Sequence, residues 1–232
     1  MRCKIIAELA TNHGGDIALA KDMITAAADA GADIVKTQAY NVEHLRRSDP
    51  QYEWFLQSQL SFEDHDKLMN HAQHCGVEYL TTAYHIDDLD LVERLGLSAV
   101  KIGSGEGRTE LVKHASTRVE TVYASLPWGL ESDHHAANVI WFATVPLYPT
   151  PPEAYAACKH HHGWSDHCVG LDIAKFAIAH GVAFVEKHFQ IDGRGRNQPW
   201  NMNADDVREL RRWADVCVLA EFGTKYEGRW TA

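Results

Sequence analysis

The sequence predicts a single (β/α)8 barrel, and the prediction rests on a recurring local pattern, on the number of strand-like runs and on the chain length. The pattern occurs as "DAGADIVKTQ", "HCGVEYLTT", "RLGLSAVKIG" and "AHGVAFVEKH". Each time, a glycine ends an amphipathic segment, a short apolar run follows, and polar side chains close the run. A chain of 232 residues matches the size that single-domain barrels reach, and no linker divides it.

The strands of this barrel are expected where short apolar runs occur: near residues 3–9, 33–37, 77–81, 98–102, 119–124, 139–143 and 182–187. The segment "GWSDHCVG" supplies one more strand, which is short and polar. Helices or stretches of helical length separate these runs. Eight βα units in one chain point to a closed parallel barrel.

The helices carry recognisable start signals. Asp16 can cap a segment in which Ile17, Ala20, Met23 and other apolar residues share one face. The sequence "SFED" at 61–64 resembles a capping box in which aspartate replaces glutamate. Further helices are expected from near Leu171 and from about Ala204 to Ala220.

The alternative architecture is an open, doubly wound sheet. It would spread the polar groups at the strand ends along one edge, whereas a barrel makes them converge. No G-x-G-x-x-G fingerprint follows the first strand, which argues against the nucleotide-binding form of the open sheet.

Composition and charge exclude several classes of function. With 45% hydrophobic and 23% charged residues, the chain is composed like a soluble globular protein. It contains no apolar run near the roughly 20 residues that a spanning helix needs, so we expect a cytoplasmic protein without a membrane partner. The formal charge of −10 argues against a broad nucleic-acid site.

Cysteine and histidine usage suggests no dedicated metal cluster. The five cysteines form no C-x-x-C pair, which fits reduced thiols that fill the core. The internal "KHHHGW" at 159–164 is interpreted as a solvated loop in preference to a metal site.

Polar residues gather at the predicted carboxyl ends of the strands, the face that carries the active site in barrel enzymes. Strand by strand they are Glu8, Asn12 and His13; Lys36 and Gln38; Thr81 and Thr82; Lys101, Ser104 and Glu106; Ser125; Tyr148; Ser165, Asp166 and His167; and Glu186, Lys187 and His188.

Two lysines among several hydroxyls suit a compact polyanion such as a phosphate ester. Lys36 and Lys101 would supply charge, and serine and threonine hydroxyls would complete the directional hydrogen bonds. The alternative for each lysine is a role as a simple ion-pair partner.

His167 and His188 end neighbouring strands and could share a divalent ion, although a pair of hydrogen-bonded core histidines is the alternative. A two-histidine site open to water would favour Lewis-acid work on a carbonyl. Glu8 is the best-placed residue for acid or base chemistry, with an ion pair to Lys36 or Lys101 as the competing interpretation.

Seven segments together resemble the sialic acid synthase family: "IIAELATNHGG", "GADIVKTQAY", "YLTTAYHIDDLDLVERLG", "VKIGSGE", "YPTPPEA", "GWSDHCVG" and "VEKHF". They follow the order of that family over nearly the whole chain to about residue 210. The family condenses phosphoenolpyruvate with an aldose to give a 2-keto-3-deoxy sugar acid. The resemblance therefore implies a phosphoenolpyruvate-dependent transferase that consists of the barrel domain.

The resemblance also implies roles for individual residues. Phosphoenolpyruvate would be held by Lys36, Thr82, Lys101, Ser104, Ser125 and Ser165. The acceptor would face Gln38, Glu106, Tyr148 and Asn197. His167 and His188 would bind a divalent metal, manganese foremost, with magnesium or cobalt as alternatives, and Glu8 would manage the proton or the attacking water.

The departures from the family concern the acceptor. Pro146 stands where the family has an asparagine, and Asn197 or Gln198 lies near the place of a sugar-binding aspartate. We expect no C-terminal antifreeze-like domain in residues 1–232, although in typical members that domain supplies an arginine to the partner subunit. A homodimer or a second subunit would then complete the acceptor site.

Two other functions fit the same residues. A metal-dependent aldolase or lyase would keep the pyruvyl pocket and change the reaction. A non-catalytic barrel would bind a phosphorylated metabolite or a partner protein, but the retained Glu8, Lys36, Lys101, His167 and His188 argue against it, because buried charges are costly to keep without use.

Overall fold

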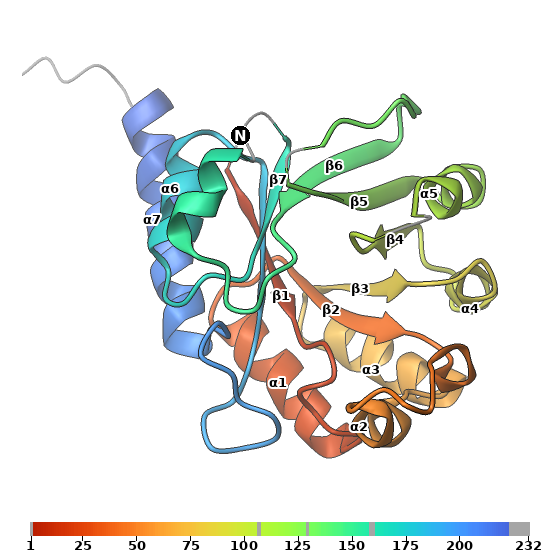
Figure 1. Ribbon diagram of the computed structural model, residues 1–232. Coiled ribbons are helices and arrows are strands. Elements are labelled where there is room, and N and C mark those ends of the chain that lie inside the picture. The colour runs from red at the N-terminus through yellow and green to blue at the C-terminus, as the bar shows by residue number, and fades with distance from the viewer. Residues whose placement is uncertain (1, 106–107, 129, 158–160, 223–232) are drawn as a thin grey trace, which may run out of the picture.

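The computed structural model describes residues 2–105, 108–128, 130–157 and 161–222, which form a closed parallel barrel (Figure 1). Its strands are β1 (Lys4–Glu8), β2 (Ile34–Ala39), β3 (Glu78–Ala83), β4 (Ala99–Ile102), β5 (Thr121–Pro127), β6 (Val139–Thr144), β7 (Gly163–Asp166) and β8 (Phe184–His188). The strand β1 pairs with both β2 and β8, which closes the ring. The predicted barrel is confirmed, and the open-sheet alternative is wrong.

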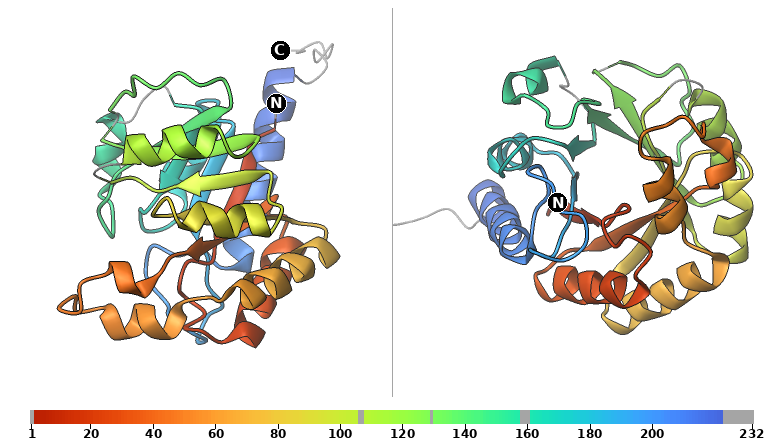
Figure 2. Two further views of the ribbon diagram at one scale, coloured as in Figure 1. Left: turned by 90° about the vertical axis from the view of Figure 1, so that its right-hand side faces the viewer. Right: turned by 60° about the horizontal axis from the view of Figure 1, so that its bottom comes forward.

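Helices surround the strands on the outside of the barrel (Figure 2). They are α1 (Ile17–Asp29), α2 (Tyr52–Ser58), α3 (Phe62–His74), α4 (Asp88–Arg94), α5 (Arg108–Ser116), α6 (Asp172–Ala179) and α7 (Ala204–Phe222), with 3-10 turns η1 (Val42–His44) and η2 (Pro152–Ala157).

The predicted caps are present. The Asp16 side chain accepts a hydrogen bond from the Leu19 amide, and Ser61 and Asp64 form the reciprocal capping box.

Two connections differ from the eight predicted βα units. Between β5 and β6 the described residues contain no helix, and Figure 1 shows a loop in green there. Between β6 and β7 the chain forms only the 3-10 turn η2. The loop sequence "LESDHHAAN" at 130–138 has no apolar repeat at helical spacing, so it offers no helix face that could pack on the barrel.

The core has an outer and an inner part. Between the strands and the helices lies a large apolar cluster that includes Ile5, Met23, Val35 and Leu210. Inside the barrel lies a smaller cluster formed by Ile6, Ile34, Leu80, Ala99, Tyr123 and Phe142. Every second residue of a strand points into the barrel. The inner apolar layer therefore forms a floor, and the inward-pointing residues nearer the carboxyl ends of the strands lie on top of it.

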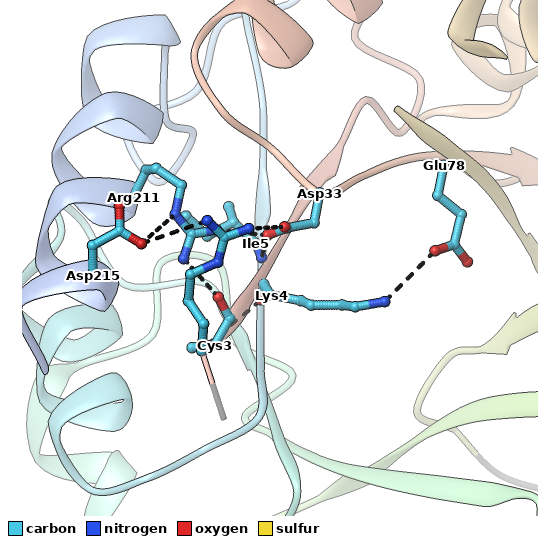
Figure 3. Close-up of polar contacts among 8 residues, drawn as sticks. Cys3, Lys4, Ile5, Asp33, Glu78, Arg211 and Asp215 are labelled. Carbon is cyan, nitrogen blue, oxygen red and sulfur yellow. Dashed lines mark hydrogen bonds and ion pairs between the residues drawn. The ribbon is translucent and has the colours of Figure 1, made fainter. Parts of the chain in front are cut away.

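Polar contacts join α7 to the amino-terminal end of the barrel (Figure 3). The Arg211 guanidinium donates to the Asp33 carboxylate at 2.7 Å and to the Cys3 carbonyl at 2.9 Å. The same aspartate accepts from the Ile5 amide at 2.8 Å. The last helix is thereby tied to the start of β1 and to the connection before β2, at the end of the barrel remote from the mouth.

The described helices include none that is long and apolar enough to cross a membrane. Cys3, Cys75, Cys168 and Cys217 are free thiols, as predicted, while Cys158 lies outside the described residues. Of the histidine run, His160 also lies outside the described residues, and His162 is exposed.

Candidate active site

A cavity of about 80 Å³ lies at the carboxyl ends of the strands, on top of the inner apolar layer. Its lining residues come from all eight strands or from the segments that follow them. They are Glu8, Lys36, Gln38, Thr82, Tyr84, Lys101, Gly103, Ser104, Ser125, Thr144, Tyr148, Ser165, His167, Glu186 and His188.

Strand alternation explains why these side chains meet. Lys36 lies two residues after Ile34 of the floor, and Thr82 lies two residues after Leu80. The register places Thr82 beside Lys101 on β4. Residues two apart along a strand share a face. In these strands an apolar inward residue is therefore followed, two positions closer to the mouth, by a polar inward residue.

Lys36 and Lys101 are buried at the base of the cavity, each beside a hydroxyl and a carboxylate. The Lys36 ammonium donates to Thr82 Oγ1 at 2.6 Å and forms an ion pair with Glu8. The Lys101 ammonium donates to Ser125 Oγ at 2.6 Å and lies 3.6 Å from Glu186 Oε2. The ion-pair interpretation of the lysines is confirmed, and both lysines also converge on one cavity.

Burial sets the charge balance of this cluster. It lowers the pKa of Lys36 to about 7, against the opposing effect of the Glu186 carboxylate. For Glu186, burial raises the pKa, but the Lys101 and Lys36 ammonium groups outweigh it and hold the pKa at about 2. An anionic ligand that enters the cavity would replace the Glu8 and Glu186 carboxylates as the ionic partner of the two lysines.

His167 and His188 lie together on the other side of the cavity. Their ring centroids are 5.5 Å apart, and the Tyr148 ring lies 4.1 Å from that of His167. The His167 Nδ1 lies 3.1 Å from the Val145 carbonyl, which can only accept, so this nitrogen carries the proton and Nε2 keeps its lone pair.

The two histidines fit a divalent metal by their chemistry. Burial lowers the pKa of His167, and burial with the neighbouring His167 lowers that of His188 well below its ordinary value, so both rings are neutral at pH 7, the form that ligates. No group of three or more histidine, cysteine or acidic side chains that could hold a metal occurs among the described residues. The fit is therefore to a site with two protein nitrogens that leaves further positions to water or substrate.

A buried ion pair stands behind these histidines. On the outward faces of β7 and β8, the Lys187 ammonium lies 2.9 Å from Asp166 Oδ2 and donates to the Cys168 carbonyl at 2.5 Å. This pair connects the two strands next to His167 and His188.

One predicted acceptor residue, Asn197, does not line the cavity. Asn197 is exposed, and its side chain is bonded within its own loop to the Gly193 amide and to the carbonyls of Ile191 and Arg194. The loop between β8 and α7 thus uses this amide for its own turn, and Asn197 is not a lining residue. Glu106 lies outside the described residues.

Sequence reasoning gave no role to four lining residues, Tyr84, Gly103, Thr144 and Glu186. Strand alternation could have identified two of them as inward-pointing, because Tyr84 lies two residues after Thr82 and Glu186 lies two residues before His188. Thr144 is the register partner of Ser165.

Comparison with known proteins decides the family. The NeuB family model matches residues 23–220 of the chain. The chain belongs to the NeuB family. It is 30% identical to the N,N'-diacetyllegionaminic acid synthase of Campylobacter jejuni, over 81% of this chain and 67% of the relative.

Other NeuB-family relatives cover a similar share of the chain. A pseudaminic acid synthase of Campylobacter jejuni is 26% identical over 94% of this chain and 73% of its own length. The crystal structure of the N-acetylneuraminic acid synthetase of Leptospira borgpetersenii superposes with a TM-score of 0.83 at 25% identity, covering 99% of this chain and 88% of that one.

Proposed function

We propose that the chain condenses phosphoenolpyruvate with the open-chain aldehyde of a sugar, giving a 2-keto-3-deoxy sugar acid and phosphate. The observation that carries the proposal is the convergence of Lys36, Lys101 and their hydroxyl partners in one cavity at the barrel mouth. Membership of the NeuB family supports it, since the relatives are named as synthases of such acids. The chain is accordingly an enzyme of the sialic acid synthase type.

The anionic substrate would lie at the base of the cavity. Lys36 and Lys101 would bind its carboxylate and phosphate oxygens, and the hydroxyls of Thr82, Ser125 and Ser165 would orient them, with Ser104 at the mouth of the fourth strand. Removal of water from this buried site strengthens each ammonium–anion attraction.

The acceptor would enter above the anion, between Gln38 and Tyr148. The C3 atom of phosphoenolpyruvate forms a bond to the aldehyde carbon, and the aldehyde oxygen takes up a proton. Water then adds at C2, and phosphate leaves by cleavage of its C–O bond. Glu8, whose Oε1 accepts from the Ala10 amide at 2.6 Å, lies beside Lys36 and would take the proton from the attacking water.

His167 and His188 would hold a divalent ion, manganese in the first place and magnesium or cobalt as alternatives. The ion would act as a Lewis acid on the acceptor carbonyl. The chain's own contribution is to present two neutral imidazoles, with the tautomer of His167 set by the Val145 carbonyl.

The function is tested by phosphate release from phosphoenolpyruvate with manganese present, across a panel of aldoses. We expect release that depends on both an aldose and the metal, with a 2-keto-3-deoxy acid as product by mass spectrometry. Release of phosphate without a new C–C bond, or no binding of phosphoenolpyruvate in calorimetry, would refute the proposal.

The metal is tested separately by titrating manganese into the protein. His188→Ala should abolish binding and leave the melting temperature close to that of the parent chain, because the ring lines the cavity and does not belong to the apolar core. His74→Ala removes an exposed histidine at the end of α3 and serves as the control. An early melting transition for His188→Ala, with no metal bound by either protein, would favour the structural role of the histidine pair.

A further inference from the structure

A second cavity, of about 160 Å³, adjoins the candidate active site. Gln38 and Tyr84 line both cavities, so the two meet along these side chains. The far walls of the second cavity include Tyr40, Leu45 and Phe55, which come from the segments that follow β2. The volume is close to that of protein cavities that hold one benzene molecule, which suits a substituent of a sugar better than a second sugar ring.

The aromatic walls are held in place by hydrogen bonds. The Tyr40 hydroxyl donates to the Phe55 carbonyl at 2.8 Å, and the two rings pack edge to face with centroids 5.8 Å apart. The Asp88 carboxylate accepts from the Tyr84 and His85 amides, both at 2.8 Å, and so fixes the backbone that carries the Tyr84 ring. The cavity is therefore preformed, as small-molecule sites usually are.

Arg108 supplies the cationic group in the lining of this cavity. It donates through one terminal nitrogen to the Tyr84 carbonyl, and its guanidinium carbon lies 5.3 Å from the centre of the Tyr84 ring. Its Nε is buried and has no hydrogen-bond partner within the described parts of the chain. No carboxylate of those parts forms an ion pair with it either. A buried donor without a partner is costly, so a ligand that offers an oxygen here gains affinity.

We propose that this cavity selects the acceptor by binding a carbonyl-bearing substituent of the sugar, an acylamino group or a carboxylate, with its oxygen on Arg108 Nε. The apolar part of the substituent packs on Leu45 and Phe55, and the sugar passes between Gln38 and Tyr84 toward the lysine cluster. The inference rests on the proposed condensation and names the residue that would determine its acceptor specificity.

The test compares sugars that differ in one substituent, both in binding and in turnover. Mannose is the reference, N-acetylmannosamine and 4-acetamido-4-deoxymannose carry the acylamino group, and mannuronate carries the carboxylate. Each sugar is titrated into the protein by calorimetry and is then assayed with phosphoenolpyruvate. Comparing the affinities of the acetamido sugars with that of mannuronate shows whether the cavity binds an acylamino group or a carboxylate.

Two variants disable the cavity in different ways. Arg108→Met removes the donor and keeps much of the side-chain stem, whereas Leu45→Trp fills the space and leaves Arg108 in place. Arg46→Met removes the same charge from an exposed neighbour of Leu45 and is the matched control. Phosphoenolpyruvate binding is measured for all four proteins and should be unchanged.

We expect the parent chain to bind at least one carbonyl-bearing sugar about 10-fold or more tightly than mannose, and both cavity variants to lose this preference while the control keeps it. A preference that survives both variants, or a parent chain that binds every sugar alike, would overturn the inference. If no sugar supports phosphate release but the Arg108-dependent binding preference persists, the proposed condensation fails and the assignment of the cavity stands.

Discussion

At the scale of single residues, the candidate site is a balanced set of charges. Lys36 is paired with Glu8, and Lys101 is paired with Glu186, and all four side chains are buried. The Thr82 hydroxyl accepts a hydrogen bond from the Lys36 ammonium, and the Ser125 hydroxyl accepts one from the Lys101 ammonium, which orients both groups. Such a set is preorganised for an anion, since the ammonium groups are oriented before a ligand arrives.

Lys101→Met should weaken phosphoenolpyruvate binding strongly. The substitution removes a buried cation and leaves Glu186 to repel the ligand, so we expect a loss of about 2 to 5 kcal/mol in binding free energy by calorimetry. Lys113→Met removes an exposed lysine of α5 and should leave binding unchanged. A dissociation constant for Lys101→Met within twofold of the parent value, in a protein that melts normally, would contradict the assignment.

At the scale of elements, β7 and β8 carry both candidate metal ligands and are joined by a buried ion pair. Asp166 and Lys187 are 0% and 1% exposed, on the faces that point away from the cavity. Asp166 Oδ1 also accepts from the Cys168 amide at 3.1 Å. The pair fixes the two strand ends from behind, where no substrate reaches.

Removing one partner of this pair should cost more than removing both. Lys187→Met leaves the Asp166 carboxylate buried without its cation, and we expect a loss of about 3 to 5 kcal/mol in the free energy of unfolding. The double variant Asp166→Leu with Lys187→Met should recover at least half of this loss, because two apolar groups need no ionic partner. Urea unfolding of the three proteins measures both values, and a single variant as stable as the parent would show that the pair is inert.

At the scale of the whole molecule, buried histidines outside the cavity connect stability to pH. His65 on α3 is 0% exposed, and its Nδ1 lies 2.8 Å from the Tyr79 hydroxyl. Burial and, to a lesser extent, the nearby His13 lower the pKa of His65 to about 4, and Asp64 opposes both effects. Burial also lowers the pKa of His13 to about 4.

The unfolded chain binds more protons than the folded chain between pH 6.5 and 4, so stability is lost as the pH falls through this window and is unaffected by these groups above it. A shift from 6.5 to about 4 corresponds to about 3 kcal/mol per histidine when complete. We expect His65→Leu to flatten the fall in unfolding free energy between pH 6.5 and 5. His74→Leu, at an exposed site, should keep the slope of the parent chain, and equal slopes for all three proteins would refute the linkage.

Much of the fold and most of the site could be read from the amino-acid sequence. The glycine-terminated helices and short apolar runs located every strand, and the caps at Asp16 and Ser61 form as expected. The polar groups predicted at the carboxyl ends of the strands include Lys36, Lys101, His167 and His188, which meet in the cavity. The resemblance to the sialic acid synthase family agreed with the NeuB family match.

The sequence by itself determined what depends on neighbours along the chain: strand alternation, helix caps and the order of polar groups at the strand ends. Only the tertiary structure decided which groups pair across the barrel. Closure of the ring brings Glu186 within reach of Lys101, and the pairing of β7 with β8 brings His167 beside His188. The tertiary structure also decided that the Asn197 side chain bonds to the backbone of its own loop and that Arg108 donates to the Tyr84 carbonyl beside the second cavity. Side chains on loops satisfy whichever partners the folded chain brings within reach, and no local pattern encodes that choice.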